Sequence, residues 1–67
     1  MNDNNIYKIS LKAWRTNKGL SQQDVADRLG VARQTVIKWE QDDAKNNGLV
    51  LYALAKLYNI DVDNIRA

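Results

Sequence analysis

The feature that most constrains this sequence is a pair of short helical patterns separated by a single glycine. Val25, Ala26 and Leu29 recur at the spacing of one helix face. Gly30 interrupts this pattern, and Val31 leads directly into a second periodic stretch. Glycine readily adopts the positive φ with which many helices end. The connection between the two helical patterns consists of little more than Gly30 and Val31. We therefore expect two short helices that cross at a tight turn.

The rest of the chain also predicts helices. Its 67 residues contain no Pro, only three Gly and no stretch of clean apolar–polar alternation, which argues against a sheet. The expected helices span about residues 6–18, 21–29, 32–41, 49–58 and 61–65, with a polar loop at 42–48. The prediction is a compact all-α fold of five helices. It forms a single domain over residues 1–67, of which residues 1–5 are flexible.

Local signals mark the ends of these helices. Asn4 or Asn5 can cap the first helix, and Gly19 can end it in a left-handed conformation. Ser21 and Asp24 form a pattern like a capping box, with Asp in place of the usual Glu or Gln. The second helix is therefore expected to begin directly after Ser21.

The inventory of side chains argues against an enzyme. The sequence has no Cys and no His, and Glu40 is its only glutamate. The commonest general base and the commonest metal ligands are thus absent. The apolar run that begins at Leu49 is far shorter than the ~20 residues of a membrane span, and residues 1–5 do not resemble a signal peptide. We expect a soluble cytoplasmic protein without cofactor, metal or small-molecule substrate.

Basic side chains are concentrated in the first part of the chain. Residues 8–38 contain seven basic and two acidic side chains, a net charge of +5, whereas residues 39–67 carry a net charge of −2. This asymmetry favours a face that binds a polyanion. In a chain this short, chance clustering of charges is the alternative explanation.

The segment LSQQDVADRLGVARQTVIKWE, residues 20–40, strongly resembles the helix-turn-helix of the lambda-repressor-like family, the phage Cro/repressor type also called the XRE family. The segment LYALAKLYNIDVDNI, residues 51–65, resembles the fourth and fifth helices of that family. The resemblance implies a bacterial or phage-encoded regulator, associated with the nucleoid, that binds double-stranded DNA. It further implies a Cro-like repressor that acts as a homodimer on a palindromic operator. The chain length fits a complete short repressor or the DNA-binding domain of a longer one.

The resemblance also implies a role for individual residues. The third helix would enter the major groove, with Arg33 and Gln34 at base edges and Lys38 at a base edge or a phosphate. Ordinary solvated helix charges are the alternative for Arg33 and Lys38. The phosphate contacts implied by the family pattern are Asn17, Lys18, Gln22, Ala32, Lys45 and Asn46. At position 32 the family usually carries Ser or Thr, so Ala32 departs from the pattern and lacks a capping hydroxyl.

Three further expectations concern packing and assembly. The resemblance implies an ion pair between Arg15 in the first helix and Glu40 at the end of the third. Trp14 lies off the apolar stripe of the first helix and is expected to be half exposed, either as a partner contact or at an unusual packing site. The dimer interface that the resemblance implies comprises Tyr58, Val62 and Ile65.

A different class of function is also compatible with the sequence. A helix-turn-helix scaffold can serve as a protein-interaction module, like an antitoxin or a regulatory partner, without reading DNA. The acidic pair Asp42 and Asp43 and the expected exposure of Trp14 motivate this alternative.

Overall fold

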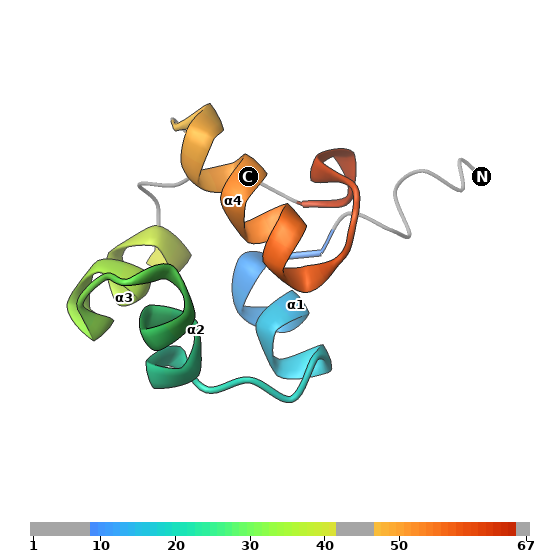
Figure 1. Cartoon of the computed structure of the whole chain (residues 1–67). Helices are drawn as coiled ribbons and strands as arrows, with labels where there is room; N and C mark the ends of the chain where they lie inside the picture. Colours follow the sequence, from blue (N-terminus) through green and yellow to red (C-terminus); the bar gives the residue numbers. More distant parts are fainter. Residues whose placement is uncertain (1–8, 42–46, 66–67) are drawn as a thin grey trace.

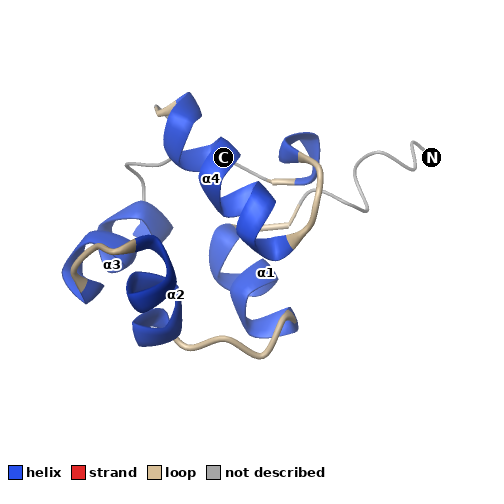
Figure 2. Cartoon of the chain, in the orientation of Figure 1, coloured by secondary structure: helices blue, strands red, loops and turns tan. Residues whose placement is uncertain are grey.

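The computed structural model describes residues 9–41 and 47–65 and shows the predicted all-α fold (Figure 1). The elements in chain order are α1 (Leu11–Asn17), α2 (Gln22–Leu29), α3 (Arg33–Gln41), α4 (Gly48–Tyr58) and the 3₁₀ helix η3 (Val62–Asn64). α2 packs on α3, α1 contacts both α3 and α4, and α4 contacts η3. Within the described segments, helices are joined by loops and turns without a strand (Figure 2). None of these helices has the length and apolar character needed to cross a membrane.

The first helix begins later than the sequence pattern predicts. Its N-cap is Ser10, which has an extended backbone and accepts a 3.1 Å hydrogen bond from the N–H of Ala13 through its hydroxyl oxygen. α1 therefore starts at Leu11. The expected caps, Asn4 and Asn5, lie outside the described residues.

The expected fifth helix is only a single 3₁₀ turn, Val62–Asn64. The carboxylate of Asp61 caps it by accepting a backbone N–H bond from Asp63. Ile65 then adopts an extended conformation and forms an isolated parallel bridge with Ile9. The N–H of Ile9 donates a 2.9 Å bond to the carbonyl of Asn64. Pairing between the two ends of the domain thus replaces further helix at both places.

Both ends of α2 form as the sequence predicts: a capping box at its start and a tight turn at its end. The hydroxyl of Ser21 accepts a 3.0 Å bond from the N–H of Asp24, and the carboxylate of Asp24 accepts a 2.8 Å bond from the N–H of Ser21. The bond from the backbone of Ser21 is the main cause that holds the pKa of Asp24 below its ordinary value of 3.8. Gly30 ends α2 with a φ of 70°, and Val31 donates its N–H to the carbonyl of Ala26 over 3.0 Å.

One small apolar core holds the helices together. Val25 and Ala26 of α2 are completely buried, and Val36 of α3 lies against them at 1% exposure. The buried side chains of the core are Leu11, Val25, Ala26, Val36, Leu54, Ala55, Tyr58 and Ile65. α3 therefore contributes only one of its nine residues to the fully buried core, which leaves much of its surface outside.

The residues expected at a dimer interface fall into two groups. Tyr58 and Ile65 are only 1% and 7% exposed and belong to the core of the protomer, so their side chains offer no surface to a partner. Val62 is 40% exposed and remains accessible. The family resemblance implied an interface role for all three positions, but the side chains of Tyr58 and Ile65 pack in the core of the protomer.

Trp14 has a structural role at the end of the core. Its ring is partly buried against the core, and its indole N–H donates a 2.9 Å hydrogen bond to the carbonyl of Asn64. The same carbonyl accepts the N–H of Ile9. Trp14 therefore joins α1 to the C-terminal turn, and this weakens the argument for Trp14 as a partner contact.

The start of α3 has no capping side chain, because residue 32 is alanine. Restoring a hydroxyl with Ala32→Thr should raise the free energy of unfolding by about 1 kcal/mol relative to the isosteric Ala32→Val. The two variants differ only in an oxygen that can accept an N–H of the first turn. Urea unfolding followed by circular dichroism measures the difference, and equal stability of the two variants would contradict the expected cap.

Candidate nucleic-acid interface

α3 presents a clearly divided surface. With about 100° of rotation per residue, five of its side chains fall within one arc of about 140°. These are Arg33, Gln34, Ile37, Lys38 and Gln41. All are exposed except Ile37, which is half-buried, while Val36 on the opposite side is buried. The structure therefore places the three predicted base-contacting residues together on the outer face of one helix.

The chemistry of this outer face suits an anionic, hydrogen-bonding partner. Arg33 offers a planar fork of N–H donors, Lys38 a compact cation, and Gln34 both a donor and an acceptor. No acidic side chain lies in the first turn of α3. Gln41 lies on the same arc and was not identified from the sequence, although its spacing of seven from Gln34 places both on one helix face.

The last turn of α3 is held by the ion pair between Arg15 and Glu40. The Nε of Arg15 lies 2.6 Å from Oε2 of Glu40, and its Nη2 lies 3.3 Å from Oε1. The remaining nitrogen, Nη1, donates a 2.9 Å bond to the carbonyl of Leu20. The two side chains are only 11% and 7% exposed. The guanidinium thus joins α1, the connection to α2 and the end of α3.

Tyr58 of α4 lies near this ion pair. Burial is the main cause that raises the pKa of Tyr58 to about 12, and the negative charge of Glu40 raises it further, whereas Arg15 opposes the shift. The phenol of Tyr58 therefore stays protonated to a higher pH than an exposed tyrosine does.

Gln22 has a different partner from the one that the sequence suggested. It is the first residue of α2, and the resemblance implied a phosphate contact for its side chain. In the structure its Nε2 donates a 3.2 Å hydrogen bond to Oε1 of Glu40. Gln22 is therefore part of the network that holds the end of α3, which the sequence pattern gave no means to identify.

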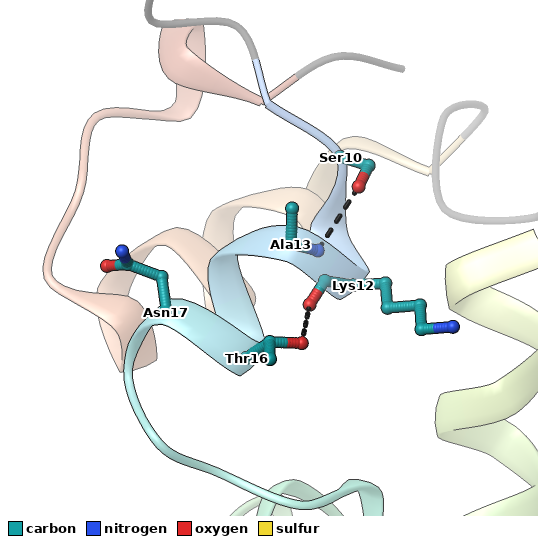
Figure 3. A pocket seen from close by; sticks show the side chains of 5 residues that line it. All are labelled: Ser10, Lys12, Ala13, Thr16 and Asn17. Carbon is teal, nitrogen blue, oxygen red and sulfur yellow. Dashed lines mark hydrogen bonds between the residues drawn. The ribbon is translucent and has the colours of Figure 1, made fainter.

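Of the other expected phosphate contacts, the structure describes Asn17, Lys18 and Ala32. In Figure 3 the side chain of Asn17 points away from α3, whereas Lys12, which the sequence did not single out, extends toward it. Lys18 is exposed, with its Nζ 6.0 Å from the centre of the Trp14 ring. Ala32 is exposed directly before α3. Lys45 and Asn46 lie outside the described residues.

We assign no ligand to a shallow pocket on α1. It is lined by Ser10, Lys12, Ala13, Thr16 and Asn17 (Figure 3). The hydroxyl of Thr16 donates a 2.7 Å bond to the carbonyl of Lys12, and the hydroxyl of Ser10 accepts the N–H of Ala13. Both hydroxyl groups thus serve the helix itself.

Comparison with known proteins identifies the family to which this arrangement belongs. A helix-turn-helix family model matches residues 11–65, which include α1, α2, α3, α4 and η3. The chain belongs to the helix-turn-helix family of the lambda-repressor-like (XRE) type. Proteins of this family are not enzymes, so the helix-turn-helix assignment excludes a catalytic role.

Two curated helix-turn-helix proteins are similar to the chain. The uncharacterized HTH-type transcriptional regulator MJ0272 of Methanocaldococcus jannaschii is 33% identical over 58 residues, which cover 87% of this chain and 88% of that protein. The HTH-type transcriptional activator BcrR of Enterococcus faecalis is 31% identical over 59 residues, 88% of this chain. The match spans only 29% of BcrR. No solved structure matches the chain significantly.

The ion pair generates a prediction about stability. Replacing Arg15 with Ala leaves Glu40 with a poorly exposed charge, and the free energy of unfolding should fall by about 3 kcal/mol. Arg15→Lys keeps the charge but cannot reproduce the three hydrogen bonds of the guanidinium, and it should show an intermediate loss. Urea unfolding followed by tryptophan fluorescence measures both effects.

The exposed Arg28 of α2 provides the control for this prediction. Arg28→Ala should change the free energy of unfolding by no more than about 0.5 kcal/mol, as is usual for surface substitutions. A loss for Arg15→Ala as small as that for Arg28→Ala would contradict the structural role of the ion pair.

Proposed function

We propose that the chain binds double-stranded DNA in a sequence-specific manner as the DNA-reading part of a transcriptional regulator. The observation that carries this proposal is the division of α3 into a fixed inner face and a free outer face. Val36 and the Arg15–Glu40 pair hold the inner face, while Arg33 and Lys38 are exposed on the outer one. The family membership and the names of both relatives as transcriptional regulators support the same function.

In the proposed complex, α3 lies in the major groove with its N-terminal end toward the bases. Arg33 donates two hydrogen bonds to the O6 and N7 atoms of a guanine, and Gln34 pairs with the N6 and N7 atoms of an adenine. Lys38, one turn later, contacts a base edge or a phosphate. Ile37 lies between these side chains on the same arc and supplies an apolar contact for a thymine methyl group.

Phosphate contacts hold the domain on the duplex in this proposal. Lys18 and the backbone N–H groups at the start of α3, next to Ala32, are the described groups that we assign to phosphates. Lys45 and Asn46 stay predictions from the family pattern. Gln22 stays a predicted phosphate contact as well: one N–H of its amide is directed at Glu40, and the second N–H is left to donate to a phosphate oxygen.

We further propose that the protein acts as a homodimer on a palindromic operator and represses transcription by occupying it. Two copies related by a two-fold axis would place their α3 helices in successive major grooves, about 34 Å apart. Among the described residues, the large apolar side chains that remain exposed are Leu49, Tyr52 and Val62, and we place the contact between protomers on this set. One relative is named an activator, so a reporter gene must decide the sign of regulation.

Selection of bound duplexes from a random pool tests the proposed function directly. The expected result is a two-fold symmetric site whose half-sites lie about 10 base pairs apart. The logarithm of the affinity for this site should fall linearly with the logarithm of the salt concentration, because phosphate contacts release counterions. Absence of enriched sequences together with an affinity independent of salt would contradict DNA binding, and an asymmetric single site would contradict the dimer.

Substitution of Arg33 separates base readout from phosphate binding. Arg33→Ala should weaken binding to the selected site by about 1–3 kcal/mol and relax the base preference at one position of each half-site. Lys18→Ala should instead weaken binding to all sequences to a similar extent and reduce the dependence on salt. Competition assays with selected and random duplexes measure both variants. Equal losses on the two duplexes for Arg33→Ala would contradict its role in base recognition.

A further inference from the structure

The helix-turn-helix is closed at both of its ends. At one end the backbone connects α2 to α3 through Gly30, whose left-handed conformation sets the turn. At the other end the first residue of α2, Gln22, donates its amide to Glu40 in the last turn of α3. A hydrogen bond between side chains thus joins the two helices where the chain itself does not.

The oxygen that receives this bond also binds Arg15. Oε1 of Glu40 accepts Nε2 of Gln22 at 3.2 Å and Nη2 of Arg15 at 3.3 Å, while Oε2 accepts the shorter bond from Nε. Arg15 belongs to α1 and fixes the end of α3 relative to that helix. Among the side-chain hydrogen bonds of the described residues, the bond from Gln22 is the one that fixes this end relative to α2.

We infer that Gln22 is a positioning residue that sets the angle of α3 through Glu40. This inference rests on the proposed DNA binding and assigns a separate role within it. The turn at Gly30 acts as a pivot close to Arg33, and Lys38 lies about 7.5 Å further along the helix axis. A change in the angle of α3 therefore displaces Lys38 more than Arg33, and sequence readout suffers most at the base pair that Lys38 faces.

A positioning role and a phosphate-binding role have different consequences for affinity. A phosphate ligand contributes to binding of every sequence alike, since the DNA backbone is the same everywhere. A residue that aims α3 matters chiefly in the specific complex, where the side chains of α3 must meet particular base edges. The ratio between specific and non-specific affinity distinguishes the two roles.

The test compares Gln22→Met with Gln23→Met in the full chain. Methionine keeps the length of the side chain and removes the amide donor. Gln23 is the matched control because it is the next residue of α2, is exposed, and bonds only its own helix through Asp27 at 2.9 Å. Affinities for the selected site and for a random duplex are measured at a temperature where both variants are fully folded.

We expect Gln22→Met to lose about tenfold in affinity for the selected site and less than about twofold for the random duplex, as loss of one hydrogen bond to a charged group would give. Gln23→Met should lose less than about twofold on both. Repeated selection with Gln22→Met should show the weakest base preference at the position that Lys38 faces. Equal losses on both duplexes, or no loss on either, would overturn the inference while leaving the proposed DNA binding intact.

NMR spectra of the variants without DNA test whether Gln22 positions the last turn of α3. In two-dimensional NMR spectra, Gln22→Met should shift the backbone amide signals of the last turn of α3, at Glu40 and Gln41, more than those near Arg33. Gln23→Met should leave both regions unchanged. Unchanged signals at Glu40 and Gln41 would overturn the inference whatever the DNA measurements give. Absence of DNA binding by the unmodified chain would instead contradict the proposed function.

Discussion

The carboxylate of Glu40 is the constraint on which the arrangement of the three N-terminal helices depends. It is only 7% exposed and accepts hydrogen bonds from α1 and from α2 at the last turn of α3. A charge so poorly solvated is tolerable only when its partners are in place, because removing them would leave its desolvation uncompensated. The correct packing of α1, α2 and α3 is therefore coupled to a single side chain.

Hydrogen bonds to Glu40 are well suited to hold α3, because one face of this helix must stay exposed. α3 has nine residues, and an isolated helix of this length is marginal in water. Its outer arc cannot be covered by other helices without hiding Arg33 and its neighbours. The inner face supplies only Val36 to the fully buried core. The hydrogen bonds to Glu40 therefore supplement the limited apolar contact. Because hydrogen bonds depend on direction, they fix the orientation of α3 more closely than burial of Val36 alone would.

The parts of the fold that follow from local rules could be predicted, and those that depend on distant contacts could not. Ser21, Asp24 and Gly30 define the boundaries of α2 through interactions within a few residues. The late start of α1 and the short 3₁₀ turn result from pairing of Ile9 with Ile65, at opposite ends of the domain. Likewise, the family pattern located Gln22 at the start of α2, but its bond to Glu40 joins residues 18 apart in the sequence, and no local pattern indicates such a bond.

Residues of the exposed face and of the buried face of α3 alternate along its sequence. This arrangement affects which substitutions the domain tolerates. Residues 33, 34, 37 and 38 carry the proposed readout. The buried Val36, the partly buried Trp39 that packs against the core, and Glu40 hold the helix. Side chains of the first group are largely exposed, so most substitutions there alter stability by less than about 0.5 kcal/mol. Base preference can therefore vary while the scaffold is retained. Gln22 is an exception in this scheme, because it lies outside α3, faces the scaffold, and still influences where the reading side chains come to lie.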